Sequence, residues 1–487
     1  MNWFDQIHHI GPAFALLLGA GVVMGADLLR PGRAPVMALT LLTLLVGFLW
    51  AILQVITDTS GPAVAGAVVV DEFALFFTFL LIGVTAAVVI ATAEGLSRVE
   101  PRPEFFALLL TSAGSMVLLA QAQDLIAIFV FLETTSISQF VLAGIARDDR
   151  SSEAGLKYLL SGAVAAAVLL YGFAFLFGLS GTTSLSGIAI FVSSGAQGTE
   201  LALILGFVLV AAGLGFKMSI APFQAWVPDV YEGAPTTVTS FLSVASKAAG
   251  FAVALRLFYV GLGGDGTFIA EHWAALFAVL AGASMTFGNA AAILQTNVKR
   301  LLAYSSIAQA GNVAVGLAAV AASGAAGPSA VLFFLATYAA TNLGAFFCVI
   351  VVSERIGSER LADYAGLLRR SPAVAVVLLI CLLSLTGIPP TAGFLAKLYV
   401  FNSAVQTGLD WMVVLVAVAV LNSAISAFYY LRWARTMVLD EPVDETPFRA
   451  SAPVQGLLGL AALAVLFFGL APSSLLQAAQ RAAENLL

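Results

Sequence analysis

Apolar residues occur along the whole chain in runs of about 17–25 positions, and short polar segments separate these runs. A helical run of this length matches the hydrocarbon thickness of a bilayer. Segments such as Val414–Leu421 are apolar at every position, unlike the alternating strands of a membrane barrel. We therefore predict fourteen transmembrane helices, at about residues 12–30, 35–57, 73–94, 104–122, 124–146, 156–180, 201–222, 236–260, 272–295, 299–322, 328–353, 372–405, 410–435 and 454–471.

The composition agrees with this helix prediction and indicates the class of protein. Of the 487 residues, 61% are hydrophobic and 10% are charged, whereas roughly a quarter of a soluble domain is charged. The net charge of −6 offers no basic patch, so nucleic acid is not an expected partner. Cys348 and Cys381 both lie in apolar runs, which excludes a disulfide framework and a cysteine metal site. The expected fold class is an all-α polytopic membrane protein in a lipid bilayer.

The basic residues predict how the helices are oriented, because cytoplasmic loops of membrane proteins are enriched in Lys and Arg. Only Arg256 and Arg481 fall on the predicted periplasmic side, and Lys217, Lys247 and Lys397 fall inside apolar runs. The others share the opposite side: Arg30, Arg33, Arg98, Arg102, Arg147, Arg150, Lys157, Lys299, Arg300, Arg355, Arg360, Arg369, Arg370, Arg432, Arg435 and Arg449. This alternation predicts a multi-pass chain with both termini in the periplasm.

Two of the predicted helices contain breaks. The seventh is interrupted at Pro222, and the twelfth, which is too long for one straight crossing, is interrupted at Pro389 and Pro390. The two breaks lie five helices apart, and a second copy of a five-helix unit must enter the membrane upside down. The spacing therefore predicts two inverted five-helix repeats with broken helices 7 and 12, as in many ion transporters.

Charged side chains inside apolar runs are the candidate functional residues, because a charge at bilayer depth costs several kcal/mol. Glu133 lies midway along the fifth helix, among Thr and Ser residues. It is either a carboxylate that senses or relays charge, or a protonated acid that only stabilises helix packing.

Lys217, Lys247 and Lys397 are the buried basic candidates. Lys217 lies five residues before Pro222, so we expect an ammonium, freed carbonyls and the negative end of a half-helix to meet there. Lys247 is too deep in its helix to reach either surface. Lys397 follows the second break and could extend to the interface. Lys157, near a helix start, is either a relay member or an interface anchor.

Lysines suit a proton relay, because a desolvated ammonium can release its proton and a neighbouring carboxylate favours its return. Helix axes stand roughly 8–10 Å apart, too far for direct transfer between side chains, so water must bridge them. No phosphate-binding Gly-Lys-Ser/Thr sequence is present, and His8, His9 and His272 lie near helix ends, which excludes a haem held between helices.

Several segments carry a resemblance to a known family. They are Gly215–Thr236, which contains Lys-Met-Ser-Ile-Ala-Pro and Val-Pro-Asp-Val-Tyr-Glu-Gly-Ala-Pro, Phe241–Phe251, Asn297–Gly311 and Leu385–Lys397. Together they strongly resemble the subunit N family of the proton-pumping NADH:quinone oxidoreductases, respiratory complex I, in its bacterial form. The resemblance covers essentially the whole chain.

The resemblance implies a single antiporter-like membrane domain over residues 1–487. Within it lie N-terminal helices at 1–95, a first repeat at 104–260, an inverted second repeat at 272–435 and a last helix at 454–471. The family's charged residues correspond here to Glu133, Lys157, Lys217, Lys247 and Lys397. Related subunits often have a histidine at the position of Gln309, which makes this residue a candidate central relay that cannot titrate.

We therefore expect a proton-translocating subunit of the bacterial inner membrane that carries no cofactor or metal of its own. Its expected partners are other membrane-arm subunits, protons and internal water, with NADH and quinone engaged only through the whole complex. A multisubunit cation/proton antiporter shares the fold and is the first alternative. A structural scaffold whose buried charges are inactive is the second.

Overall fold

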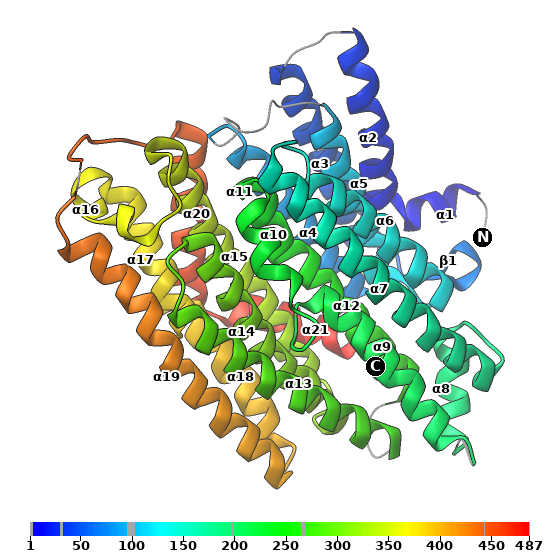
Figure 1. Ribbon diagram of the computed structural model, residues 1–487. Coiled ribbons are helices and arrows are strands. Elements are labelled where there is room, and N and C mark those ends of the chain that lie inside the picture. The colour runs from blue at the N-terminus through cyan, green and yellow to red at the C-terminus, as the bar shows by residue number, and fades with distance from the viewer. Residues whose placement is uncertain are drawn as a thin grey trace.

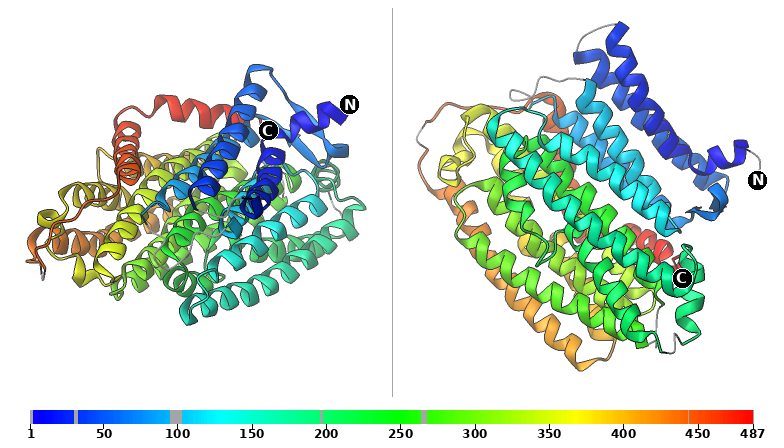
Figure 2. Two further views of the ribbon diagram at one scale, coloured as in Figure 1. Left: turned by 90° about the horizontal axis from the view of Figure 1, so that it is seen from above. Right: turned by 45° about the vertical axis from the view of Figure 1, so that its right-hand side comes forward.

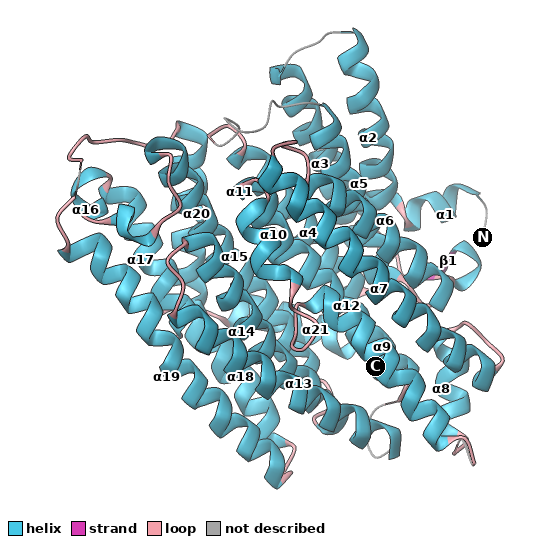
Figure 3. Cartoon of the chain, viewed as in Figure 1, coloured by secondary structure: helices cyan, strands magenta, loops and turns pink. Residues whose placement is uncertain are grey.

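The computed structural model describes residues 3–29, 33–94, 103–195, 198–263, 268–442 and 444–486, nearly all of them in helices (Figures 1 and 3). Up to the first break the elements are α1 Trp3–His9, α2 Gly11–Leu29, α3 Arg33–Ile56, β1 Gly61–Ala63, η1 Val64–Gly66, β2 Val68–Val70, α4 Glu72–Ala91, α5 Pro103–Gln121, α6 Leu125–Ala143, α7 Asp149–Ser180, α8 Leu185–Ser193 and α9 Glu200–Met218. They continue as α10 Trp226–Gly233, α11 Thr236–Phe241, η2 Leu242–Ser246, α12 Lys247–Leu255, η3 Arg256–Gly261, α13 Phe268–Ile293, α14 Val298–Ala319, η4 Val320–Ala322, α15 Ala326–Ile356, η5 Leu361–Tyr364, α16 Leu367–Arg370, α17 Pro372–Thr386, α18 Ala392–Gln406, α19 Asp410–Leu439, α20 Ala452–Leu470 and α21 Ser473–Glu484.

Thirteen helical segments among the described residues are long and apolar enough to cross a membrane. The remaining predicted crossing, the twelfth at 372–405, is divided into the shorter apolar helix α17 and the helix α18 that follows it. The predicted all-α membrane fold is therefore confirmed. Arg30, Arg98 and Arg102, which belong to the predicted cytoplasmic set, lie outside the described residues.

Local signals in the sequence fix many of the helix ends. The carboxylates of Asp124 and Asp148 accept hydrogen bonds from the first free backbone N–H groups of α6 and α7. Because Asp148 caps α7, this helix begins seven residues before the predicted start at 156. Gly387 ends α17 in the left-handed conformation, at φ 90°, which glycine adopts without steric cost.

Three of the spans are buried almost completely inside the bundle. The segment Thr236–Gly261, α14 and α15 are the most completely buried, whereas α7, α19 and α20 expose long apolar sides. Exposed leucines and valines of this kind are stable against lipid rather than water. Figures 1 and 2 show the most buried helices in the middle of the molecule, with the N-terminal helices α2 and α3 on one flank and α19 on the other.

The two broken helices run in opposite directions. In Figure 1, α9 and α10 ascend from the lower right, whereas α17 and α18 descend from the upper left. α1, the short hairpin and α21 gather at one end of the bundle, and the loops before α17 and before α20 lie at the other. The opposed directions agree with the predicted inversion of the second half relative to the first.

The structure adds elements that the apolar pattern did not predict. The strands β1 and β2 pair antiparallel between the second and third crossings, with Gly61 opposite Val70. The helix α21 is amphipathic and packs on α15 and α4. Arg256, predicted as a periplasmic charge, is buried in the π-helical turn η3, where it pairs with Asp71 at 2.7 Å and donates to the carbonyl of Ala120.

Candidate functional site

The first helix break lies directly after Lys217. The helix α9 ends at Met218, and Ser219 adopts a left-handed conformation at φ 62° before Pro222. The indole N–H of Trp226, at the start of α10, donates at 3.1 Å to the carbonyl of Phe216, which also accepts from the backbone N–H of Ser219 at 3.2 Å. The predicted interruption of the seventh crossing is thus confirmed, and part of its backbone is satisfied by the second half of the same broken helix.

The ammonium of Lys217 points into a pocket of aromatic rings. The side chain is buried, and Nζ lies 5.7 Å from the ring centres of Phe140 and Tyr158 and 5.9 Å from that of Phe216. Among the described residues, the only side chain that accepts a hydrogen bond from Nζ is that of Gln139, whose Oε1 lies at 3.5 Å. Ring faces and an amide oxygen are both partners that stabilise a positive charge.

Glu133 lies on α6 and is half-buried. Its side chain and that of Lys217 line the same small cavity, together with Ser136. The hydroxyl of Ser136 donates to the carbonyl of Leu132, in its own helix. Glu133 and Lys217 are therefore neighbours across a shared cavity, while the ammonium of the lysine is directed toward Gln139.

Lys247 follows the π-helical turn η2 and is almost completely buried, as predicted. Its Nζ donates to the carbonyl of Ser306 at 2.6 Å and also to the hydroxyl of the same residue. The hydroxyl of Tyr338 donates to the Ser306 hydroxyl at 3.0 Å. Ser306, on α14, thus links the eighth crossing to α15.

The second break surrounds Lys397. The ammonium of this buried residue donates to the carbonyls of Leu385 at 3.1 Å and Thr386 at 2.8 Å, which are the last two residues of α17. Pro389 and Pro390 occupy the gap between α17 and α18. A half-helix C-terminus with free carbonyls carries a partial negative charge, and here an ammonium neutralises it.

The meeting of ammonium and freed carbonyls that was expected at Lys217 is therefore found at Lys397. The reason is the direction of helical side chains, which point toward the N-terminus of their own helix. Lys217 precedes its break, so its side chain points away from the carbonyl end of α9. Lys397 follows its break on α18, so its side chain points back to the carbonyls of α17.

Gln309, the candidate central relay, lies beside the second break. Its Nε2 donates to the carbonyl of Leu385 at 2.8 Å, and its Oε1 accepts from Nδ2 of Asn312 at 3.1 Å. Gln309, Tyr338 and Lys397 line one small cavity. The structure thus brings Gln309 to Lys397.

Lys157 lies apart from the buried lysines. Its exposed side chain pairs with Asp229 on α10 and with Glu153, both at 2.8 Å. These residues line a cavity of about 210 Å³ with Arg150, Glu232 and Arg300. Lys157 therefore belongs to a polar network at the end of the bundle that carries the loop before α17.

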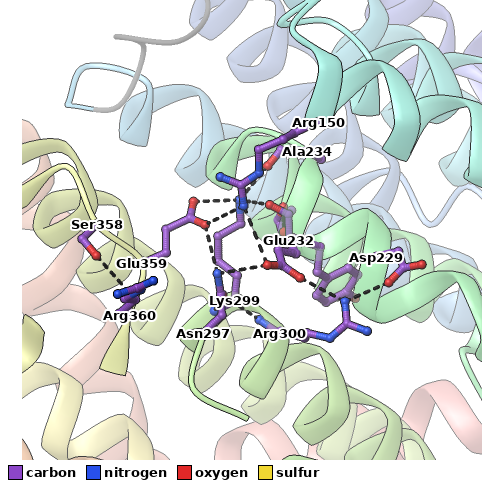
Figure 4. A network of polar contacts seen from close by, with 12 residues as sticks. Arg150, Asp229, Glu232, Ala234, Asn297, Lys299, Arg300, Ser358, Glu359 and Arg360 are labelled. Atoms are coloured by element: carbon purple, nitrogen blue, oxygen red, sulfur yellow. Dashed lines mark hydrogen bonds and ion pairs between the residues drawn. The ribbon is translucent and has the colours of Figure 1, made fainter. Parts of the chain in front are cut away.

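This network connects the two halves of the fold (Figure 4). Arg300, on α14, pairs with Asp229 at 2.8 Å and with Glu232 at 2.9 Å, both on α10. Lys299 is fully buried, donates to the carbonyls of Glu232 and Ala234, and pairs with Glu359 at 3.1 Å. The second half of the first broken helix is thus attached to the start of α14 and to the loop after α15.

Glu359 is a carboxylate of this network with three polar partners, Lys299, Asn297 and Arg150. Burial alone would raise the pKa of this carboxyl, but the charge and hydrogen bond of Lys299, a hydrogen bond from Asn297 and the charge of Arg150 together hold its pKa below the ordinary value. Glu359 is therefore ionised at neutral pH. No cluster of three or more His, Cys, Asp or Glu residues suited to a metal ion occurs within the described ranges.

Comparison with known proteins identifies the family of this arrangement. The family model described as "NADH:quinone oxidoreductase/Mrp antiporter, TM" matches residues 122–423, which include both broken helices. NADH-quinone oxidoreductase subunit N of Dehalococcoides mccartyi is 42% identical over 90% of this chain and 91% of its own length. The chain belongs to the subunit N family of the NADH-quinone oxidoreductases.

Solved structures agree with this family. A chain of respiratory complex I from Thermus thermophilus, solved with bound aureothin, is 33% identical and superposes with a TM-score of 0.79 over 96% of this chain and 98% of its own. A chain of the Mrp complex from Dietzia sp. DQ12-45-1b, at 21% identity, superposes with a TM-score of 0.86 over 100% of this chain and 98% of its own. The second likeness shows only that the antiporter-like fold is shared.

Sequence reasoning missed the neutral side chains that contact the lysines in this member of the subunit N family. Gln139, Tyr158, Ser306 and Tyr338 are all buried, and none carries a charge that would make it stand out in an apolar run. A weak signal existed for two of them. Tyr158 directly follows Lys157, and Ser306 lies within the Asn297–Gly311 segment that carries the family resemblance.

Proposed function

We propose that this chain is a proton-translocating membrane-arm subunit of a bacterial NADH:quinone oxidoreductase. The observation that carries the proposal is the position of the three buried lysines. Each lies at an irregularity of its helix: Lys217 at the end of α9, Lys247 after the π-helical turn η2, and Lys397 beside the carbonyls of α17. Helix irregularities of this kind are where membrane transporters bind ions.

Neutral polar side chains join these lysines into one path through the bundle. Ser246 and Lys217 both contact the amide oxygen of Gln139, and Ser246 directly precedes Lys247. Ser306 and Tyr338 continue from Lys247 to the cavity that Lys397 lines. Water molecules complete the contacts between these groups in the proposed path.

The proposed driving step is electrostatic. A charge change that arrives from a neighbouring subunit alters the attraction between Glu133 and Lys217, which share a cavity. Lys217 then passes its proton toward Lys247, and Lys397 releases a proton on the opposite side. The electron chemistry, the NADH site and the quinone site belong to other subunits, and this chain carries no redox centre of its own.

We further propose the inner membrane as the location, with both termini in the periplasm. The support is the split of basic residues between the two ends of the bundle. Arg150, Lys299, Arg300 and Arg360 lie together around the polar network (Figure 4), and Arg370 and Arg449 lie in α16 and in the loop before α20.

A multisubunit cation/proton antiporter is the alternative function. The family model covers both classes, and the fold is common to them. The subunit N relatives favour the oxidoreductase, because they match at 42% identity over most of the chain, against 21% for the Mrp structure.

The experiment that tests the proposal uses an affinity tag on this chain in its native membrane. The tagged chain should purify in a complex that oxidises NADH with a quinone and translocates protons in vesicles. Lys217→Met should leave the yield of complex unchanged and remove most proton translocation. Purification with antiporter subunits would contradict the oxidoreductase assignment, and normal pumping by Lys217→Met would favour a structural scaffold.

A further inference from the structure

Four helices meet at the side chain of Gln139. This residue lies on α6 and is fully buried. Its Oε1 accepts hydrogen bonds from the hydroxyls of Tyr158 at 3.1 Å and Ser246 at 2.9 Å, and it lies 3.5 Å from Nζ of Lys217. Its Nε2 donates to the hydroxyl of Ser112, on α5, at 3.3 Å. One neutral amide thus connects α5, α7, α9 and the π-helical turn η2.

We infer that Gln139 is a positioning residue that holds the ammonium of Lys217 next to Ser246, the last residue of the turn η2 that directly precedes Lys247. The inference rests on the proposed proton-translocating function. A side-chain amide does not titrate in the working pH range, so Gln139 cannot carry the proton as a charged group and is not itself a relay member. Because its N–H groups are directed to Ser112, its oxygen faces the three donors.

Of the three contacts that the Gln139 oxygen makes, with Tyr158, Ser246 and Lys217, the one with Lys217 is the longest. A long contact of this kind restrains the ammonium weakly. At 3.5 Å it is an attraction between a charge and a dipole rather than a short hydrogen bond. The rings of Phe140, Tyr158 and Phe216 complete the pocket around the ammonium. Tyr158 also stacks on Trp226 at 4.3 Å, which links the pocket to the second half of the broken helix.

Gln139 and Glu133 therefore offer Lys217 two alternative partners. Both lie on α6, six residues apart, and Glu133 lines the small cavity beside Lys217. Contact with Gln139 directs the ammonium toward Ser246 and Lys247, whereas movement toward Glu133 would direct it away from them. Loss of the amide oxygen should then leave Lys217 with Glu133 and slow the transfer to Lys247.

The test uses the assembled complex in membrane vesicles and the rate of NADH-driven proton translocation. Gln139→Met keeps the length of the side chain and removes the acceptor. It should lower the rate about tenfold at an unchanged yield of complex, the factor that corresponds to losing an acceptor for a charged group. Gln121→Met is the matched control, because Gln121 is a buried amide with no hydrogen bond to the described residues, and it should pump normally.

A second variant supplies a readout that a packing defect would not change. Gln139→Glu keeps an acceptor but adds a carboxylate that would retain the proton of Lys217. Its pumping should therefore be low at pH 8 and rise as the pH falls and the new carboxyl becomes protonated. The groups that face this position are the ammonium of Lys217 from α9, the hydroxyl of Tyr158 from α7, and the neutral hydroxyls of Ser112 and Ser246. Two further charged groups lie nearby: Glu133, six residues earlier on α6, and Lys247, which directly follows Ser246.

The outcomes separate the inference from the proposed function. Normal pumping by Gln139→Met in intact complex would overturn the inference, and so would a pH profile of Gln139→Glu that matches the unmodified complex. If Gln139→Met lowers the yield of complex, the inference is judged from Gln139→Glu alone: pumping that rises as the pH falls supports it, and an unchanged pH profile overturns it. Normal pumping by Lys217→Met, measured in parallel, would instead overturn the proposed function.

Discussion

Gln309 and Lys397 donate hydrogen bonds to the same atom, the carbonyl oxygen of Leu385, at 2.8 and 3.1 Å. This carbonyl lies in the last turn of α17, where the helix leaves its acceptors free. A neutral amide and an ammonium therefore share one acceptor at the end of α17. Because an amide does not titrate, the hydrogen bond of Gln309 does not depend on a charge of its own.

In the proposed path from Lys247 to Lys397, Tyr338 is a hydroxyl-bearing side chain that lies next to both lysines. Its hydroxyl donates to Ser306, which accepts from Lys247, and its side chain lines the cavity of Lys397. Tyr338→Phe should lower proton translocation about tenfold, because it removes one hydrogen bond next to a charge. Proton uptake by vesicles during NADH oxidation measures this. Tyr171→Phe, on the exposed side of α7, should have no effect.

Lys247 must release its proton in every cycle if it is a relay member. Arginine keeps a positive charge at nearly the same place but stays protonated above about pH 12. Lys247→Arg should therefore pump nearly as poorly as Lys247→Ala, provided that the yield of intact complex is unchanged. Proton uptake at the unmodified rate in Lys247→Arg would mean that a fixed charge suffices and that the proton takes another route.

Two substitutions at Glu133 show whether its charge is needed for function or its side chain only stabilises helix packing. Glu133→Gln keeps the volume and the hydrogen-bonding groups while it removes the charge, so it should spare assembly and cut proton pumping several-fold. Glu133→Asp keeps the charge and should retain much more activity. Both variants are compared by pumping rate per assembled complex. Equal activity in the two variants would return Glu133 to a role in helix packing alone.

Glu359 should contribute stability in a pH-dependent way. Its pKa lies below the ordinary value, so its contribution is complete above the pKa of the unfolded state, about 4.3, and disappears as the pH falls through the lower folded-state pKa. At pH 7, Glu359→Gln should reduce stability by about 2 kcal/mol, because the buried Lys299 loses its charged partner. Thermal unfolding of the solubilised complex at pH 7 and below pH 4 measures the difference, which should shrink in acid. Glu445→Gln, on an exposed loop, is the control.

The predicted orientation can be tested with reporter fusions in two loops. A reporter inserted at Glu445, before α20, should behave as cytoplasmic. One inserted at Gly324, between α14 and α15, should behave as periplasmic. Alkaline phosphatase activity and green fluorescence report the two sides. Detection of both loops on the same side would contradict the proposed topology.

The sequence by itself determined the membrane class, the approximate position of every crossing, the two breaks and the buried charges. These features are local, because an apolar helix needs only its own residues to match the bilayer and a proline disrupts its own helix. The same locality explains why Glu133, Lys217, Lys247 and Lys397 could be named in advance. Each is a charge that stands out in its own apolar run.

Only the tertiary structure decided what those charges contact. The bond between Ser246 and Gln139 joins positions 107 residues apart, and the contact of Lys217 with Gln139 joins positions 78 apart. The sequence left the partners of Lys157 open, and only the fold brings its ammonium to Asp229, 72 residues away, in the polar network. Neutral partners such as Gln139 and Tyr338 carry no signal in the sequence, because an amide or hydroxyl becomes important only when helix packing brings a buried ammonium within reach of it.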